Sequence, residues 1–273
     1  MTLDEIRKRI SKDSETKNLK IADVDLLKVN KYLDDRDKEF DGSKLKLITE
    51  PYIDVIYVET EATKEKRLND KMRRNLHVFG SDVFINKDAS FTNFKVLDDQ
   101  RSKALEISIK FVDDFLSGKQ VKGIFLHGMY STGKTYLLSA IANELARKEK
   151  TVLFVFLPDL VRVIKGGISS GDMEDKVMKL KQTDVLMIDD LGGENLTVWF
   201  RDEIFLPIIQ YRLSANLPTL FTSNMTLEQL VEPLSIDYTL KENKLKAIRI
   251  IRRISDYNHQ IELVTNFKWF KWI

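Results

Sequence analysis

The segment KGIFLHGMYSTGKTYLLSAIAN, residues 122–143, decides the fold of this 273-residue chain. It contains the pattern G-x-x-x-x-G-K-[ST], with its fixed positions at Gly128, Gly133, Lys134 and Thr135. The apolar run at residues 124–126 predicts a buried strand before the pattern, and the apolar spacing of residues 136–145 predicts a helix after it. A glycine-rich turn between a strand and a helix is the setting that phosphate binding requires.

This arrangement predicts a site for a nucleoside triphosphate. Backbone N–H groups of the turn would surround the phosphates, and the positive end of the following helix would add attraction. Lys134 would reach the β- and γ-phosphates from a solvent-exposed position, and the Thr135 hydroxyl would hold Mg²⁺. The predicted nucleotide-binding residues are Gly128, Ser131, Thr132, Gly133, Lys134, Thr135 and Tyr136. The alternative is a chance glycine-rich turn before a core helix, and the flanking elements argue against it.

A pair of carboxylates follows the apolar run at residues 185–188. Asp189 and Asp190 come directly after this run, where carboxylates are costly to bury unless they have ligands. At the carboxyl end of a buried strand, Asp189 would bind Mg²⁺ and Asp190 would polarise the attacking water. The alternative is a polar turn after a core strand, and the phosphate-binding pattern makes it the weaker reading.

Asn224 ends another apolar run, at residues 219–223. If this run is a strand of the same sheet, the Asn224 amide can reach the γ-phosphate and the attacking water. Asn is equally suited to cap the helix that residues 226–230 predict. The residues alone leave both roles open.

Composition excludes several classes of protein. The chain has no cysteine, which excludes disulfides and a thiolate zinc site, and its three histidines are too scattered to form a ligand pattern. Its formal net charge is only +2, so any nucleic-acid binding must depend on local patches. No apolar run approaches the length of a membrane span, and the charged N-terminus lacks an apolar signal core. We therefore expect a cytoplasmic protein.

The pattern of elements divides the chain into two domains, at residues 1–88 and 89–273. In the first, a small charged α+β module, periodicity predicts two helices and two strands, near residues 3–10, 24–34, 45–49 and 52–58. A basic helix at residues 64–75 is more typical of a solvated face than of a nucleic-acid contact. In the second domain strands and helices alternate, which predicts a three-layer α/β domain with a parallel sheet.

Two basic helical segments of the second domain have no role fixed by their residues. The first is a predicted pair of helices at residues 160–165 and 172–181, separated by a break at Gly166-Gly167. The second is the predicted helix at residues 241–253, which carries Arg249 and Arg253 on one face because they are four residues apart.

The end of the chain predicts a last strand and an aromatic tail. The strand is expected at residues 260–264, and residues 267–273 then interleave aromatic residues with lysines. Such a mixture can stack on single-stranded bases, but it more often docks on its own domain.

With these residues placed, the chain resembles the bacterial replicative-helicase loaders of the DnaC and DnaI type, which are AAA+ ATPases. The resemblance covers about residues 91–264. The stretches that carry it are GKTYLLSAIANELARK, DVLMIDDLGGE, WFRDEIFLPIIQYR, LPTLFTSN and KAIRIIRRI. Their order and spacing together are specific, and the DnaI type is the more similar.

The resemblance implies a role for each site residue. Lys134 with Thr135 would form the Walker A pair, Asp189 with Asp190 the Walker B pair, and Asn224 would be sensor 1. Arg249 falls at the position of the arginine finger, which enters the neighbouring subunit's site. Arg253 falls at the sensor-2 position, which contacts the subunit's own nucleotide. The catalytic residues implied in this way are Asp190, Asn224, Arg249 and Arg253.

The resemblance also implies cofactors and partners. They are ATP and Mg²⁺, a hexameric replicative helicase gripped by residues 1–88, single-stranded DNA on the helices at residues 160–181, and further copies of the ATPase domain. The sequence departs from the family at Ser131, where the loop commonly has Gly, so the turn must avoid the most strained backbone region. Asp190 stands where most AAA+ proteins have Glu, which suggests slow hydrolysis, and the stretch after Asn224 is too short for a full lid.

The function that follows is ATP-controlled loading of a ring helicase onto single-stranded DNA at origins or restarted forks. A transposition helper ATPase of the same clade would bind duplex DNA and a transposase instead. Two alternative functions belong to other classes of protein: a nucleotide-gated adaptor with negligible turnover and a small-molecule kinase. A kinase would need a pocket for a phosphate acceptor, and the pair Asp189-Asp190 fits activation of water better.

Overall fold

The computed structural model describes residues 1–79, 85–193, 196–236 and 239–264. The chain forms two compact units, Met1–Asp70 and Lys71–Ile273. Among the described residues, no helix is long and apolar enough to cross a membrane.

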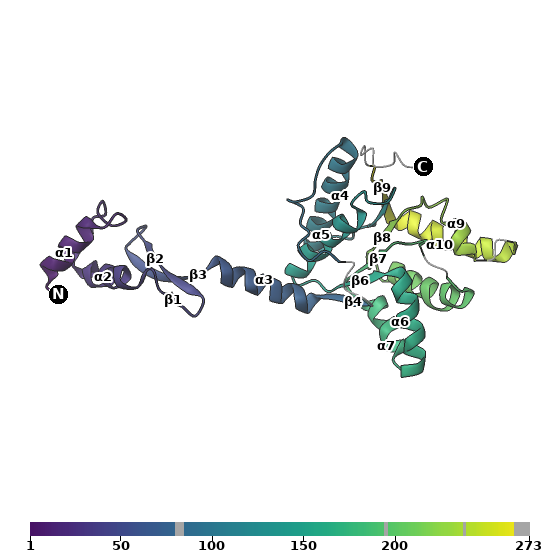
Figure 1. Ribbon diagram of the computed structural model, residues 1–273, viewed down its shortest axis with the longest axis horizontal. Helices are drawn as coiled ribbons and strands as arrows, with labels where there is room; N and C mark the ends of the chain where they lie inside the picture. The colour runs from purple at the N-terminus through teal and green to yellow at the C-terminus, as the bar shows by residue number, and fades with distance from the viewer. Residues whose placement is uncertain (80–84, 194–195, 237–238, 265–273) are drawn as a thin grey trace. The chain divides into compact units, whose positions relative to one another are not determined.

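The first unit is a small α+β module (Figure 1). It contains the helices α1 (Leu3–Lys12) and α2 (Leu26–Asp35), a 3₁₀ turn at Asp23–Asp25, and an antiparallel sheet of β1 (Glu39–Phe40), β2 (Ser43–Ile48) and β3 (Asp54–Glu59). Apolar residues one turn apart on α1, Ile6 and Ile10, pack with Val29 and Leu33 of α2 and with Leu47 of β2. This confirms the fold class expected for the module.

The second unit is built on a six-stranded parallel sheet with the order β4-β6-β7-β8-β5-β9. Its strands are β4 (Leu76–Phe79), β5 (Gly123–His127), β6 (Val152–Phe156), β7 (Val185–Asp189), β8 (Thr219–Ser223) and β9 (Asn258–Glu262). The apolar runs that predicted buried strands therefore form the centre of the sheet. Strand β9 begins at Asn258, two residues before the expected strand.

Helices cover both faces of this sheet, which makes the three layers that were expected (Figure 1). On one face, α4 (Asp99–Leu116) and α5 (Lys134–Arg147) pack on alternate strand residues such as Ile124 and Met187. The other face is covered by α6 (Leu157–Ser170), α7 (Met173–Gln182), α8 (Leu206–Ser214), α9 (Val231–Ser235) and α10 (Lys241–Tyr257), with Phe125 and Ile188 beneath them.

The boundary between the units differs from the expected one at residues 88/89. It falls at Asp70/Lys71, inside helix α3 (Glu61–Asn75). The reason is strand β4, which pairs in parallel with β6 from Leu76 to Phe79 and so belongs to the large sheet. The run LHVF is too short for its periodicity to reveal this pairing in the sequence.

Helix α6 does not break at Gly166-Gly167, contrary to expectation. Glycine costs about 1 kcal/mol in a helix relative to alanine, but burial of the apolar face of α6, with Ile164 at its centre, outweighs that cost. A Cβ at Gly167 would lie 3.0 Å from the Cα of Met173, so this glycine lets α7 pack closely against α6.

A π-helical turn at Phe200–Phe205 leads directly into α8. The helix expected at residues 226–230 is a turn, and the short helix α9 follows it. The aromatic tail at residues 267–273 lies outside the described residues.

Candidate nucleotide-binding site

The predicted phosphate-binding loop lies between β5 and α5 at the carboxyl end of the sheet. In an open parallel sheet, this end is where ligands bind between strands whose connections run in opposite directions. Strand β5 continues through α5 on one face, and its neighbour β8 continues through α9 and α10 on the other. The loop is therefore at the topological switch point of the sheet.

The backbone of the loop explains its glycines. A Cβ on Gly128 would lie 2.1 Å from the carbonyl oxygen of Leu263, so the loop can pass the end of β9 only with glycine there. Gly133, at the start of α5, has φ +94°, which other residues rarely adopt. Ser131 has φ +61°, so this residue occupies the left-handed region despite its Cβ, at a cost of about 1–2 kcal/mol.

Lys134 is buried, and the expectation that it is exposed is wrong. The side chain is 7% exposed, and its Nζ donates to the carbonyl oxygens of Gly128 at 2.8 Å and Met129 at 2.7 Å and to Oδ1 of Asn224 at 2.9 Å. Burial lowers the pKa of Lys134, while the carboxylates of Asp189 and Asp190 favour its charged form. The amine therefore stands inside the site, where it joins the loop to β8.

Asp189 ends β7 and accepts hydrogen bonds from two threonine hydroxyls. Thr135 Oγ1 lies 3.0 and 3.1 Å from its two carboxylate oxygens, and Thr222 Oγ1 lies 2.5 Å from Oδ1. Burial raises the pKa of Asp189, and both hydrogen bonds oppose that rise. The predicted pair of metal ligands, Thr135 and Asp189, is therefore in direct contact.

Asp190 and Asn224 face each other across the same edge. The Nδ2 group of Asn224 donates to Asp190 Oδ1 at 2.9 Å, and the amide oxygen accepts from Lys134. The Asn224 side chain thus lies in the site and does not cap a helix. Of the two positions that the sequence left open for it, the structure has the one beside Lys134 and Asp190. Burial raises the pKa of Asp190, whose backbone has φ +62°.

Together these groups line a pocket of about 390 Å³. Its lining includes all the predicted nucleotide-binding residues except Gly128, together with Asp189, Asp190 and Asn224; the other residues that line it are Tyr130, Phe156 and Thr222. Thr222 was missed by sequence reasoning, although a hydroxyl in the apolar strand β8 was the available signal. It holds Asp189 and accepts the Asp190 N–H at 2.9 Å.

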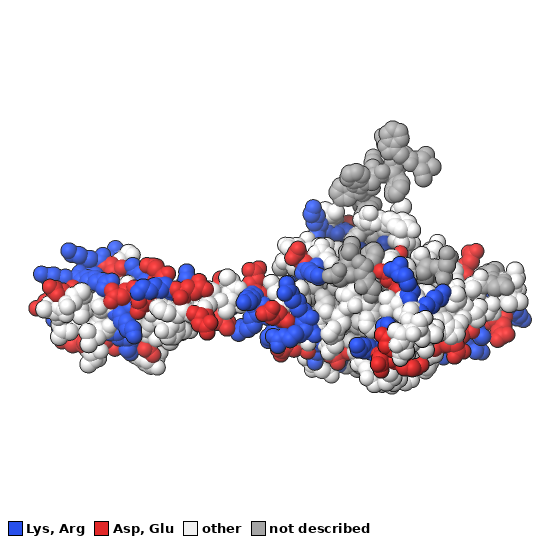
Figure 2. Space-filling model, turned by 60° about the horizontal axis from the view of Figure 1, so that its bottom comes forward, with Lys and Arg blue, Asp and Glu red and all other residues white. Residues whose placement is uncertain are grey.

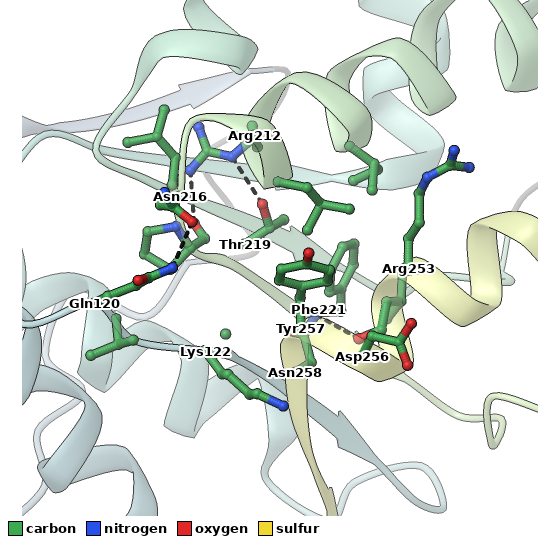
Figure 3. Close-up of a pocket in the computed structure, with 17 residues that line it drawn as sticks. Gln120, Lys122, Arg212, Asn216, Thr219, Phe221, Arg253, Asp256, Tyr257 and Asn258 are labelled. Carbon is green, nitrogen blue, oxygen red and sulfur yellow. Dashed lines mark hydrogen bonds between the residues drawn. The ribbon is translucent and has the colours of Figure 1, made fainter.

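Arg249 and Arg253 do not line this pocket. Arg249 is exposed in the middle of α10. Arg253 lines a separate cavity of about 300 Å³ beside Lys122 and Asn258, at the amino ends of the strands (Figure 3). Arg253 thus lies at the opposite end of the sheet from the phosphate-binding loop, away from the pocket of its own subunit where the resemblance had implied a role for it.

The domain has three layers built on a parallel sheet, with a phosphate-binding loop after β5 and two carboxylates at the end of β7. These features define a P-loop nucleotide-binding domain of the AAA+ class. The model of the IstB-like ATP binding protein family matches residues 43–264, and the chain belongs to that family.

Relatives and a solved structure agree with this class. The replicative helicase loader DnaI of Bacillus subtilis (strain 168) is 33% identical over 205 residues, which cover 74% of this chain and 65% of DnaI. The replicative helicase loader DnaC of Escherichia coli (strain K12) is 27% identical over 177 residues, 64% of this chain and 71% of DnaC. A crystal structure of DnaI superposes with a TM-score of 0.63 and 40% identity, over 70% of this chain and 98% of that one. The chain thus spans about two-thirds of the length of the B. subtilis relative.

Proposed function

We propose that this protein loads a replicative ring helicase onto single-stranded DNA under the control of ATP. The observation that carries the proposal is its similarity to the helicase loader DnaI, 33% identical over 205 residues. ATP would hold the loader on helicase and DNA, and hydrolysis would release it.

The donor set of the site fits Mg²⁺. The Thr135 hydroxyl and the Asp189 carboxylate are hard oxygen ligands on two different elements, already 3.0 Å apart. Thr135 and Asp189 would hold Mg²⁺, which would supply positive charge to neutralise the negative charge that develops on the phosphates. Thr222 keeps the carboxylate oriented toward Thr135.

Asp190 is the residue that we assign to the attacking water. Asn224 fixes its carboxylate by one hydrogen bond and contacts the Lys134 amine by another, so the base and the phosphate-binding amine share one positioning residue. A base must be ionised to accept a proton, and burial raises the pKa of Asp190. Hydrolysis should therefore decline on acidification at a higher pH than an ordinary aspartate would cause.

Asp190→Asn is expected to abolish hydrolysis and to stabilise the protein by on the order of 1 kcal/mol. Asparagine adopts the left-handed backbone of this position more readily, and it removes a half-buried charge. Because the folded state binds the Asp190 proton more tightly than the unfolded chain, the destabilisation is present above the raised pKa and is relieved as the pH falls through it.

Thermal unfolding at neutral pH, with ATP turnover measured in parallel, tests this expectation. Asp175→Asn, on the exposed side of α7, is the matched control and should change neither quantity. A lower melting temperature for Asp190→Asn, or unchanged turnover, would contradict the assignment.

Single-stranded DNA is expected to contact the hairpin of α6 and α7 through its lysines. The proposed contacts are Lys165, Lys176, Lys179 and Lys181. Lys165 and Lys179 are exposed, whereas Lys176 pairs with Asp172 at 2.7 Å. We therefore expect Lys165 and Lys179 to contribute more to DNA affinity than Lys176. On the face shown in Figure 2, basic and acidic residues are interspersed, so any DNA contact has to be local.

Replacing the four lysines by alanine should flatten the dependence of log K on log salt by about one unit for each phosphate contact that is lost. Lys165→Ala with Lys179→Ala should account for most of the change. Lys103→Ala with Lys110→Ala, exposed on α4 across the sheet, is the control pair. An unchanged slope in the quadruple variant would move the DNA site elsewhere.

We assign helicase binding to the first unit, which holds none of the residues of the nucleotide pocket. The deciding experiment supplies the host's replicative helicase, circular single-stranded DNA and the full-length protein. Helicase transferred to the circle only with this protein and ATP supports loading. Binding of duplex DNA and a transposase instead would favour the transposition helper, and loading without turnover would favour the nucleotide-gated adaptor.

A further inference from the structure

Arg101, near the start of α4, is buried beneath the phosphate-binding loop. The residue is 6% exposed, and its guanidinium lies 4.4 Å from the centre of the Phe94 ring. Its Nε donates to the carbonyl oxygen of Lys95 at 2.6 Å, and its Nη1 donates to the carbonyl oxygen of Thr132. Asp98 accepts the backbone N–H of Arg101 at 2.8 Å. A positive charge is thus held on backbone carbonyls and an aromatic face, at the back of the loop.

The carbonyl that Arg101 binds belongs to the same peptide group as the N–H of Gly133. A peptide group is planar and trans, so its C=O and N–H point in opposite directions. Gly133 lines the nucleotide pocket, and a Cβ on it would lie 3.4 Å from Nη2 of Arg101. Holding the carbonyl on the α4 side therefore turns the N–H toward the pocket side.

The hydrogen bond from Arg101 to the Thr132 carbonyl matters because the next residue is glycine. Gly133 has φ +94°, and a glycine peptide can rotate into other conformations at little cost. A hydrogen bond from an ionised donor is about twice as strong as a neutral one, and it also polarises the amide so that its N–H becomes a better donor. An anchor at Thr132 thus both orients and strengthens a phosphate-binding N–H group.

We propose that Arg101 is a positioning residue for the phosphates of the nucleotide: from behind the loop it fixes the Thr132–Gly133 peptide so that the Gly133 N–H faces the β-phosphate. This inference rests on nucleotide binding at the loop and is independent of helicase loading. A purely structural Arg101 would instead anchor α4 through Lys95 and Phe94, and its loss would affect stability alone.

The two roles differ in their dependence on the number of phosphates. Affinities for ADP and AMP are measured on the full-length protein, because AMP lacks the β-phosphate. Arg101→Met keeps the apolar stem and removes the charge and the donors. It should weaken ADP binding by about 10- to 100-fold, the loss expected for one charge-assisted hydrogen bond, and AMP binding by less than about threefold.

Two controls separate this effect from loss of charge or of packing. Lys103→Met removes an exposed cation from the same helix, and Phe111→Leu loosens the buried face of α4 in the core. Neither should change the ratio of the two affinities. Arg101→Lys keeps the charge with fewer donors and should bind ADP with intermediate affinity, which preserves the test if the methionine variant fails to fold.

Three results would overturn the inference: ADP affinity of Arg101→Met within about threefold of wild type, a parallel loss of ADP and AMP affinity, or the same selective loss in Phe111→Leu at matched stability. If the wild-type protein bound neither nucleotide, nucleotide binding itself would be wrong and the inference would fail with it. Failure of helicase loading with intact ADP binding would leave the role of Arg101 standing.

Discussion

Replacing Arg249 by alanine is expected to lower ATP hydrolysis by about 10³–10⁵-fold while ATP affinity stays close to that of the wild type. Arg249 is exposed on α10, between the buried residues Ile250 and Ala247, which fix the helix on its own sheet. It does not line the nucleotide pocket of its own subunit. We propose that Arg249 stabilises transition-state charge in the site of a neighbouring subunit.

Mixing two inactive proteins tests whether Arg249 acts in the neighbouring subunit. The Lys134→Ala protein has an impaired pocket and an intact Arg249, and the Arg249→Ala protein has the reverse. In a mixed assembly, some interfaces pair the intact pocket of one with the intact arginine of the other. Hydrolysis should therefore return in part, at concentrations where subunits meet or on the helicase with single-stranded DNA.

Arg253→Ala is the matched comparison, because Arg253 lies one turn further along the same face of α10. If Arg253→Ala lost hydrolysis and was rescued by mixing while Arg249→Ala behaved as wild type, the finger would be Arg253. Arg253 is half-buried at the amino end of the sheet, also outside its own nucleotide pocket. Absence of recovery at every ratio, with co-assembly demonstrated, would remove Arg249 from the neighbour's site.

The residues at the strand ends could be predicted from the sequence because each follows an apolar run. Asp189, Asp190 and Asn224 are found in this way, and parallel strands bring their carboxyl ends to one edge. The phosphate-binding loop was predictable for the same reason, since its chemistry depends on a local pattern of glycines, lysine and threonine.

Residues that act through distant contacts were not predictable. Arg101 reaches Thr132 across 31 positions in the chain, and Thr222 reaches Asp189 across 33. In the sequence, these residues are one arginine in a charged helix and one threonine in a strand, and neither pattern indicates a partner. The buried position of Lys134 likewise involves an acceptor 90 positions away, Asn224 after β8, that no local pattern encodes.

Arg212 is another residue whose distant contacts could not be predicted from the sequence. Its replacement is expected to cause the largest loss of stability. Its side chain is fully buried in α8, and its guanidinium donates to Thr219 Oγ1 at 2.9 Å. It also donates to five carbonyl oxygens, those of Leu180, Lys181, Thr183, Asp184 and Pro218. Burial lowers the pKa of Arg212 to about 9, which leaves it charged at neutral pH. One side chain thus joins the segments that lead into β7 and β8.

Arg212→Met is expected to destabilise the second unit by about 3–5 kcal/mol, a large part of the 5–15 kcal/mol typical of folded proteins. Methionine fills most of the volume, so the loss should come from the hydrogen bonds. Replacing a buried ion pair by apolar residues can be neutral, because both partners are removed together. Here the partners are mainly backbone carbonyls, which remain in place and lose their donor.

Denaturant unfolding of the full-length protein measures this loss, with Arg252→Met as the control. Arg252 is exposed on α10, so its removal should cost less than about 1 kcal/mol. Strands β7 and β8 carry Asp189 and Asn224 at their other ends, so a folded Arg212→Met protein should also bind nucleotide more weakly. A change in unfolding free energy no larger than that of the control would show that the buried network does not stabilise the sheet.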